Sequence, residues 1–275
     1  MNKTSTEKRA QIIRCLVEGN SIRATCRLTG AAKNTVSKLL VDAGKACSDY
    51  QDAAFRNLPC KRIQCDEVWS FIGCKEKQVT REKKEQGQGD CWTWTALCAD
   101  TKLIPCWFVG TRDGGAAYHF IHDLAERLAN RVQLTTDGHR AYLSAVEDAF
   151  GSEIDYGMLN KVYGNAPQGP EVRYSPAVCM GAKKAVISGQ PVFEHISTSF
   201  IERSNLSLRM GNRRFTRLTN GFSKKIENHE HALALYFMYY NFCRIHQTLR
   251  VTPAMEAGVS QHVWNIEEIV ALIPN

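Results

Sequence analysis

Three acidic residues, far apart in the chain, each stand in a local sequence suited to presenting a carboxylate. Asp66 lies within the apolar run IQCDEVWSF, Asp137 ends the run VQLTTD, and Glu202 opens the polar and basic segment ERSNLSLRMGNRRFTR. Carboxylate oxygens are ligands that hard divalent cations prefer. If two strands and a helix bring these three groups together, they form a site for divalent metal.

The first of these acids has a neighbour that competes with it for the same role. Successive residues of a strand point to opposite faces, so Asp66 and Glu67 are not expected to aim at one site. By alternation Glu67 shares a face with Cys65 and Trp69. The pattern alone therefore does not exclude Glu67.

The third acid opens a helix with an unusual face. At about 100° per residue, one stripe of this helix is expected to carry Glu202, Asn205, Leu206, Arg209 and Arg213, with Arg217 close to it. A phosphate bound to metal at Glu202 would have its flanking phosphates within reach of Arg209 and Arg213. We therefore predict that DNA is contacted by Asn205, Arg209, Arg213 and Arg217. An exposed helix with scattered arginines is the alternative.

The segments before the second acid predict the strands that would position Asp66. IQCDEVWSF, CWTWTALCA and LIPCWFVG are short runs rich in β-branched and aromatic residues, which favours a three-stranded antiparallel meander. Between the first two lies KEKQVTREKKEQGQGD, with five basic and four acidic residues. It has no core-forming periodicity, so we expect a long solvated loop that reaches toward DNA.

A helical crossover then leads to the second acid. GGAAYHFIHDLAERLAN predicts an amphipathic helix with Phe120, Leu124 and Leu128 along one side, and RVQLTTD predicts a buried strand before the helix AYLSAVEDAF. If the first and fourth strands are neighbours, Asp66 and Asp137 approach within metal-bridging distance. A later helix over 223–243 carries Leu233 and Phe237 on one face and is expected to pack on the sheet.

The N-terminal segment has the pattern of a small helical domain. TEKRAQIIRCLVEG, SIRATCRLTG and a helix from about Ala32, with Val36, Leu39 and Leu40 inward, follow one another across short turns. This is the order of a helix-turn-helix, whose last helix enters the major groove of DNA. The residues predicted to contact DNA are Arg23, Arg27, Lys33, Asn34, Thr35 and Lys38. Three small helices that serve only for protein contact are the alternative.

Charge and composition fit an enzyme with an anionic partner. The net charge is +7, and residues 1–50 and 201–250 hold nine Lys and Arg each against four and three acids. Two of the three candidate metal ligands lie in the acidic remainder. The eleven cysteines show no CxxC pair, so we expect free thiols rather than disulfides or a zinc site. No apolar signal region or membrane-spanning run is evident, which favours a cytoplasmic protein.

Several of these segments together resemble a known family. CDEVWSF, TTDGHRAY and SFIERSNLSLRMGNRRFTR are similar to the three acidic motifs of DDE transposases from bacterial insertion sequences, in particular of the insertion sequence one type. The later YNFCRIHQTLRVTPA resembles the segment that ends many such catalytic domains. With the helical N-terminal part, the resemblance extends from about residue 5 to residue 260.

The resemblance implies a ribonuclease H-like fold of the α/β class, a mixed sheet flanked by helices and preceded by a small all-α helix-turn-helix domain. It favours Asp66 over Glu67, and it implies that Asp66, Asp137 and Glu202 bind two Mg²⁺ ions, replaceable by Mn²⁺, ~3.5 to 4 Å apart. The implied partners are double-stranded DNA at element ends and target sites, and further copies of the chain in a dimer or higher oligomer. The implied location is the bacterial nucleoid.

The expected domain organisation follows from these assignments. Residues 1–48 form the helix-turn-helix domain, 49–60 a linker, 61–250 the catalytic domain and 251–275 a C-terminal tail. Compared with the family, the spacing from Asp137 to Glu202 is long, and the excess lies in 160–198, with four of the eight prolines. We expect an inserted, partly irregular subdomain there that contacts DNA ends or a partner subunit, or is an inert elaboration.

Other candidates remain beside these assignments. Glu171 and Glu194 are rival third acids, but neither begins a helix lined by arginine. His139, two residues after the second acid, is expected to contact the scissile phosphate. Two further functions stay open: a domesticated transposase that regulates by binding DNA, and a ribonuclease H-like nuclease or resolvase. Three acids in suitable contexts favour catalysis, and the N-terminal helices favour a sequence-directed transposase.

Overall fold

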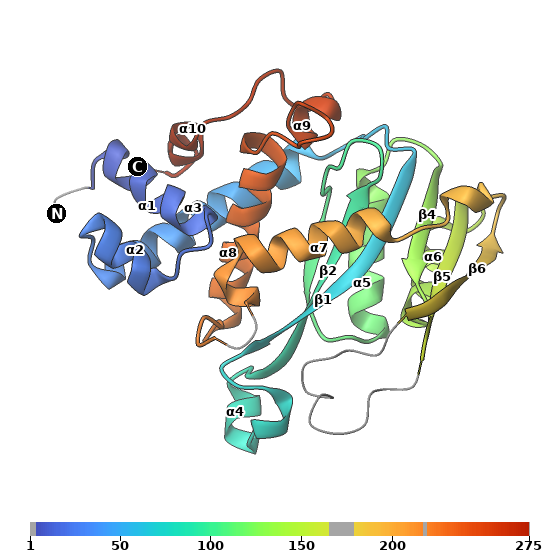
Figure 1. Cartoon of the computed structure of the whole chain (residues 1–275), viewed down its shortest axis with the longest axis horizontal. Helices are drawn as coiled ribbons and strands as arrows, with labels where there is room; N and C mark the ends of the chain where they lie inside the picture. Colours follow the sequence, from blue (N-terminus) through green and yellow to red (C-terminus); the bar gives the residue numbers. More distant parts are fainter. Residues whose placement is uncertain (1–3, 165–178, 217–218, 275) are drawn as a thin grey trace.

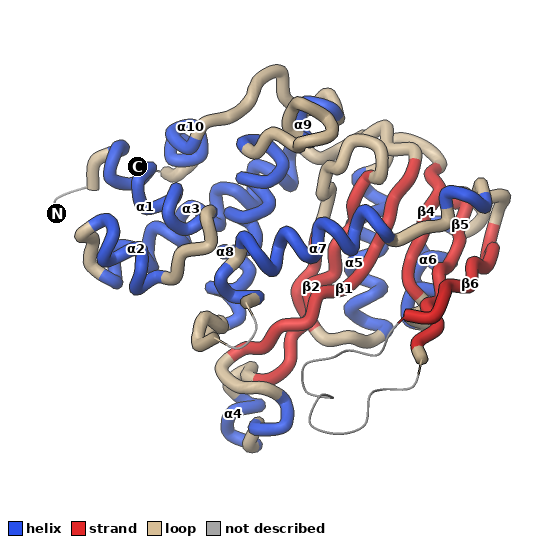
Figure 2. The backbone as a smooth tube through the Cα atoms, viewed as in Figure 1, coloured by secondary structure: helices blue, strands red, loops and turns tan. Residues whose placement is uncertain are grey.

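A computed structural model describes residues 4–164, 179–216 and 219–274 of the chain. It contains one mixed sheet with helices on both faces and a group of helices at one end (Figure 1; Figure 2). The strands are β1 (Arg62–Ile72), β2 (Gly89–Cys98), β3 (Trp107–Gly110), β4 (Val132–Asp137), β5 (Ile154–Tyr163) and β6 (Cys179–Ser188). The expected α/β class is therefore confirmed at the level of a mixed sheet flanked by helices.

The order of the six strands is β3-β2-β1-β4-β5-β6. β1, β2 and β3 form the predicted antiparallel meander, and β4 pairs with β1 in parallel, as the crossover helix allows. β5 adds in parallel to β4, and β6 returns antiparallel to β5. The two strands predicted to carry acids, β1 with Asp66 and β4 with Asp137, are thus direct neighbours.

Much of the segment expected to be an irregular insertion is regular in the structure. Residues 160–163 complete β5, and 179–188 form β6, so these parts extend the sheet. The sequence did not predict β6 because this strand is largely exposed on both faces. An edge strand without a buried face lacks the apolar alternation of a core strand. Residues 165–178, including Glu171, lie outside the described residues.

Two helices cover each face of the sheet. α5 (Gly114–Arg127) and α6 (Ala141–Phe150) bury Phe120, Leu124 and Tyr142 against one face. α7 (Ser199–Gly211) and α8 (Ile226–Met238) cover the other face, where Leu233 and Phe237 are buried as predicted. A π-helical turn, Tyr239–Cys243, continues α8. The opposite faces of β1 therefore look onto different helix pairs, which decides where Asp66 and Glu67 point.

The three N-terminal helices form as predicted. They are α1 (Thr6–Val17), α2 (Ile22–Thr29) and α3 (Lys33–Ala54). Ser21 caps α2 by accepting a hydrogen bond from the Ala24 N–H at 3.1 Å, and Gly30 ends it in the left-handed region at φ 68°. Val36, Leu39 and Leu40 are buried.

Helix α3 is longer than predicted and enters the region expected to be a linker. Ala43, Cys47 and Gln51 continue one buried face at helical spacing, so nothing ends the helix before Ala54. This face packs on α8, where the Gln51 side-chain amide donates to the Ala234 carbonyl at 3.1 Å. A Cβ on Gly44 would lie only 2.4 Å from that of His231, so glycine permits the close crossing. The prediction of a linker over 49–60 is therefore wrong for residues 49–54, which belong to α3.

The remaining elements are short. The connection from β1 to β2 contains a 3-10 turn (Glu76–Gln78) and α4 (Arg81–Glu85), both exposed as expected for that solvated loop. Two more 3-10 turns flank α7, at Phe193–His195 and Arg213–Phe215. The predicted tail instead contributes α9 (Pro253–Glu256) and α10 (Ile266–Ala271), and Trp264 packs on Tyr50 of α3. In the part of the chain that is described, no helix has the length and apolar character needed to cross a bilayer.

Candidate functional site

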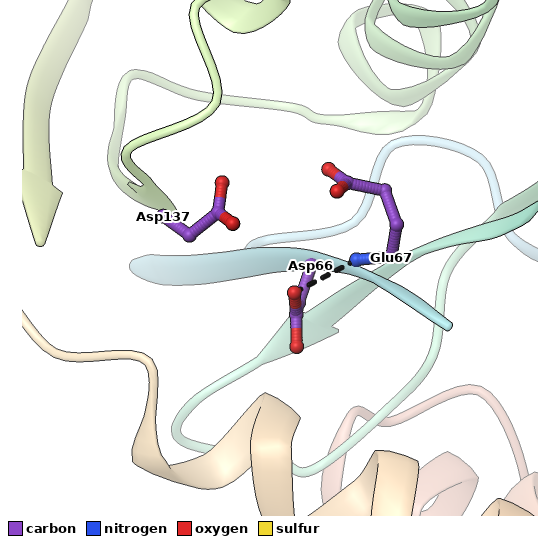
Figure 3. Close-up of side chains that lie close together, drawn as sticks. All are labelled: Asp66, Glu67 and Asp137. Atoms are coloured by element: carbon purple, nitrogen blue, oxygen red, sulfur yellow. Dashed lines mark hydrogen bonds between the residues drawn. The ribbon is translucent and has the colours of Figure 1, made fainter. Parts of the chain in front are cut away.

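Two of the predicted acids meet where β1 and β4 run side by side. Gln64 of β1 is level with Thr135 of β4, so two residues further on Asp66 is level with Asp137. Figure 3 shows their carboxylates together with that of Glu67. One carboxylate oxygen of each lies within 4.8 Å of the others, and this is the one such group of three potential metal ligands among the described residues.

The two aspartates are held by different elements. Asp66 Oδ1 accepts the backbone N–H of Glu67 at 2.9 Å, and Oδ2 accepts the Asn205 side-chain amide of α7 at 2.8 Å. Asp137 Oδ1 accepts the backbone N–H of His139 at 2.9 Å, in the turn after β4. Each carboxylate therefore keeps oxygen lone pairs available while its orientation is fixed.

Glu67 lies on the opposite side of β1 from Asp66, as alternation predicts (Figure 3). Its side chain is only 1% exposed, and its Oε2 accepts the Arg112 Nε–H at 3.0 Å. Although the two side chains leave opposite sides of the strand, their carboxylates approach each other, so the expectation that they would not meet at one site is wrong. Asp66 turns back along its own backbone toward the Glu67 N–H, which brings the two carboxylates within 4.8 Å.

Glu202 reaches the same cleft but is not part of this group of three. It stands in the first turn of α7, where Thr198 donates a hydrogen bond to Oε1 and Lys161 of β5 lies 2.6 Å from Oε2. Asp66, Asp137 and Glu202 all line a cleft of about 890 Å³. The structure therefore brings the three predicted acids to one cleft, with the third engaged by a lysine.

The arginine stripe predicted on α7 is shorter than expected. The helix ends at Gly211, whose Cα packs so close to Tyr236 that a Cβ would lie 3.0 Å from the ring. Arg209 lines the cleft, whereas Arg213 lies beyond the helix in a 3-10 turn and does not continue the stripe. Arg217 falls outside the described residues.

Asn205 contacts the first acid directly. It is buried, donates to Asp66, and accepts the Thr95 hydroxyl at 3.3 Å. A side chain held in this way orients a carboxylate, and it also lines the cleft. The DNA contact of Asn205 stays a prediction. Helical phase alone could not separate an inward from an outward position on this stripe.

The electrostatics of the group show how crowded it is. Burial, followed by the charge of Asp137, raises the pKa of Asp66 to about 6. Burial and the same aspartate raise the pKa of Glu67 to about 7, against the lowering influence of Tyr142 and Arg112. A bound cation would remove this repulsion. Oxygen donors alone, crowded and partly desolvated, match the ligand set of a hard divalent cation.

His139 sits at the floor of the cleft beside these acids. Its ring packs between Trp94 and Tyr142, with centroid distances of 5.7 Å and 6.1 Å. Burial, and then the nearby Arg112, lower its pKa, so the imidazole is neutral at pH 7. Its Nε2 is buried without a partner among the described residues. The predicted phosphate contact stays a prediction.

Among the described residues, four lysine and arginine side chains line the cleft around the acids, and only one of them was predicted by name to contact DNA. That residue is Arg209; the others are Arg112, Arg140 and Lys161. Arg112 follows β3 in the turn TRDGG, Arg140 precedes α6, and Lys161 lies on a strand that was not predicted. Arg112 and Arg140 each lie between a strand and the helix that follows it, and a basic residue at that position could have indicated a contact with an anion.

The predicted DNA-contacting residues of the N-terminal helices lie at the surface. Arg23, Arg27, Lys33, Asn34 and Lys38 are exposed, and Thr35 is half-buried. Lys38 forms an ion pair with Asp42 at 2.5 Å. Exposure leaves these N-terminal cations available to an anionic partner without identifying one.

The eleven cysteines are free thiols, as predicted.

Comparisons with known proteins add little to this picture. No family model and no curated protein matches the sequence. Among solved structures, the chain is similar to a piggyBac transposase in a synaptic complex with hairpin DNA, at a TM-score of 0.48 and 10% identity, over 99% of this chain and 72% of that one. Similarity at this level establishes neither a common fold nor a common activity. The function has to be argued from the cleft.

Proposed function

We propose that this protein is a DDE transposase of the bacterial insertion sequence one type, which cleaves DNA at the ends of its element and transfers the strands to target DNA. The observation that carries the proposal is the meeting of Asp66 and Asp137, each two residues beyond the last paired positions of the adjacent parallel strands β1 and β4, with Glu202 in the same cleft. A mixed sheet in which β4 runs parallel beside the antiparallel β1–β3 is compatible with a ribonuclease H-like core.

The acids would hold the divalent metal. Asp66 and Asp137 supply adjacent oxygens, and Glu202 faces them from the first turn of α7. Mg²⁺ bound there would polarise the scissile phosphate and activate the attacking hydroxyl or water. We propose two ions per site, as the resemblance implies, with Mn²⁺ able to replace Mg²⁺.

The surrounding residues orient this ligand set and favour a polyanion. Asn205 fixes Asp66, and Thr198 fixes Glu202 through hydrogen bonds from their side chains. Arg140 and Arg209 line the cleft, where they would balance the charge of the DNA backbone. These groups would bind the substrate and keep its phosphate at the acids, which is the role of positioning in phosphoryl transfer.

Recognition of element ends would lie in α2 and α3. Lys33, Asn34, Thr35 and Lys38 occupy the first turns of α3, with Arg23 and Arg27 on α2 beside them. In a helix-turn-helix these positions contact base edges and phosphates. Because two ends must be joined in one complex, the working form would be at least a dimer. A regulator that only binds DNA would not need the crowded, costly group of acids.

Cleavage by matched variants tests the catalytic part of this proposal. The substrate is DNA that carries the inverted repeats flanking the gene, incubated with Mg²⁺ or Mn²⁺. Asp137→Asn should lower the cleavage rate by about a thousandfold or more, since a metal ligand is lost, and should leave DNA binding intact. Asp148→Asn, the same change at an exposed residue of α6, is the control. Equal cleavage by wild type and Asp137→Asn would refute the assignment.

Point substitutions test the recognition part. Deleting the N-terminal helices would be a poor test, because Val36, Leu40 and Cys47 of α3 belong to the main core. Lys33→Gln with Lys38→Gln should instead weaken binding to the terminal repeats, with Lys45→Gln, an exposed change later on α3, as control. End-specific binding that survives the double substitution unchanged would place recognition elsewhere in the molecule.

A further inference from the structure

Arg112 is a basic residue of the cleft that forms ion pairs with two members of the acidic group. Its Nε lies 3.0 Å from Glu67 Oε2, and its Nη2 lies 3.6 Å from Asp137 Oδ2. The second distance is too long for a hydrogen bond. The guanidinium is thus anchored by one edge and stands beside Asp137 with its other edge uncommitted.

Three separate contacts fix the position of this guanidinium. Its carbon lies 4.8 Å from the centroid of the Trp92 ring, so the plane rests on an aromatic face. The turn that carries it is tied down on both sides. The Trp94 indole N–H donates to the Thr111 carbonyl at 3.0 Å, and Asp113 caps α5 by accepting the Ala116 N–H at 3.0 Å.

The free edge of Arg112 faces the cleft that would hold DNA. The side chain is 37% exposed and lines the cleft together with Asp137 and Arg140. A guanidinium presents five N–H donors in a planar fork, and Glu67 takes only the one on Nε. Donors fixed in this way match two oxygens of a phosphodiester.

We propose that Arg112 binds the phosphodiester at the reacting position, and that Glu67 is a positioning residue that holds Arg112 and not a metal ligand. The proposal rests on the proposed function for the identity of the substrate. It also accounts for a buried carboxylate on the face of β1 opposite to Asp66. An anion approaching three carboxylates needs a fixed cation beside them, and Arg112 supplies it.

The alternative is that Glu67 ligates the metal directly, since its carboxylate lies within 4.8 Å of both aspartates. The two readings differ in what the loss of Glu67 removes. A positioning residue acts through Arg112, so its loss should weaken phosphate binding without weakening metal binding. A metal ligand would show the reverse.

The test measures two affinities of the full chain for four variants. DNA affinity is measured with a short duplex in EDTA, and Mn²⁺ affinity by titration without DNA. The variants are Arg112→Gln, Glu67→Gln, the double change, and Arg131→Gln as control. Arg131 pairs with Asp155 near the opposite end of β4 and is 38% exposed, close to the exposure of Arg112.

Arg112→Gln should weaken duplex binding about 10- to 100-fold, the range for losing a charge-assisted contact. Glu67→Gln should also weaken duplex binding. In the Arg112→Gln background it should weaken binding no further, because both residues act through one guanidinium. Mn²⁺ affinity should not fall in either variant. Arg131→Gln should match wild type in both measurements. Thermal unfolding of each variant, and partial rescue of DNA binding by a fifth variant, Arg112→Lys, separate this effect from loss of fold.

Wild-type duplex affinity in Arg112→Gln would overturn the proposal, as would a fall in Mn²⁺ affinity confined to Glu67→Gln. The proposed function fails on a different result. If wild type binds no Mn²⁺ and cleaves nothing while Arg112→Gln still loses duplex affinity, Arg112 remains the phosphate-binding residue of a site that does other chemistry.

Discussion

Two clusters of charged side chains in this molecule differ in how their charges are balanced. In the first, the Arg127 guanidinium of α5 is 8% exposed and bonds to Asp123 and Asp52 at 2.7 Å each, which ties α5 to α3. In the second, Asp66 and Glu67 in the middle of β1 and Asp137 at the end of β4 crowd together with one guanidinium beside them.

The pKa values of Arg127 and Asp66 are both raised, which has opposite consequences for the charge of a base and of an acid. Burial opposes the charge on Arg127, but its hydrogen bonds and the negative charges around it together outweigh burial and leave the pKa of Arg127 raised. In the second cluster burial and mutual repulsion raise the pKa of Asp66 to about 6, so its charge is disfavoured. The first cluster therefore stabilises the fold, whereas the second keeps carboxylates in a costly state that a bound cation would relieve.

Breaking the balanced cluster should have the largest effect on stability. Arg127→Met removes the shared partner of Asp52 and Asp123 and the link between α3 and α5. We expect a loss of about 2–3 kcal/mol in the free energy of unfolding, less than for a fully buried pair because the aspartates are partly exposed. Denaturant unfolding measures it, with Arg56→Gln, a more exposed partner of Asp52, as control. A loss no greater than that of the control would contradict a stabilising role for the cluster.

Relieving the crowded cluster should have the opposite sign. A carboxyl with a raised pKa makes the folded state bind protons more tightly, so its ionisation costs stability as pH rises from 3.8 through about 6. Asp66→Asn in EDTA should therefore gain about 1–2 kcal/mol at pH 8, part of the full shift being offset by a weaker bond to Asn205.

The gain from Asp66→Asn should shrink as pH falls from 8 to 5, as measured by denaturant unfolding at several pH values. Saturating Mg²⁺ should reverse the ranking, because metal then stabilises only the wild type. A gain that does not depend on pH would mean that repulsion is not its source.

The smallest effect is expected at Lys161, which pairs with Glu202 on the rim of the cleft. Both side chains are about a third exposed, at 30% and 37%. Exposed ion pairs contribute about 0–1 kcal/mol, so Lys161→Met should change the free energy of unfolding by less than about 1 kcal/mol. A loss as large as that of Arg127→Met would make the Lys161–Glu202 pair part of the framework of the fold.

The parts of the fold that the sequence predicted have a buried face, although β5, whose first half is also buried, was missed. The β-branched and aromatic runs of β1, β2 and β4 and the amphipathic faces of α5 and α8 predicted the meander, the crossover and the meeting of Asp66 with Asp137. β6 escaped prediction because an exposed edge strand carries no such pattern. The full length of α3 was not predicted because its second half is buried by α8, where Ala234 contacts Gln51 from 183 residues later in the chain.

The sequence predicted the acidic residues of the candidate site but not the side chains that contact them. Each acid stood in a distinctive local sequence, whereas the contacts of Glu67 with Arg112 and of Glu202 with Lys161 join segments that only the folded sheet brings together. The same limit explains Asn205, whose helical stripe was right but whose direction toward Asp66 depends on how α7 packs on the sheet.

Locating Mn²⁺ by anomalous X-ray scattering from crystals of the protein grown with Mn²⁺ tests the central claim most directly. The account predicts density for the ion between the carboxylates of Asp66 and Asp137, with Glu202 released from Lys161 to complete the ligands and Glu67 still bonded to Arg112. Absence of an ion at Asp66 and Asp137 under saturating Mn²⁺ would contradict the assignment of this cleft as a metal-dependent catalytic site.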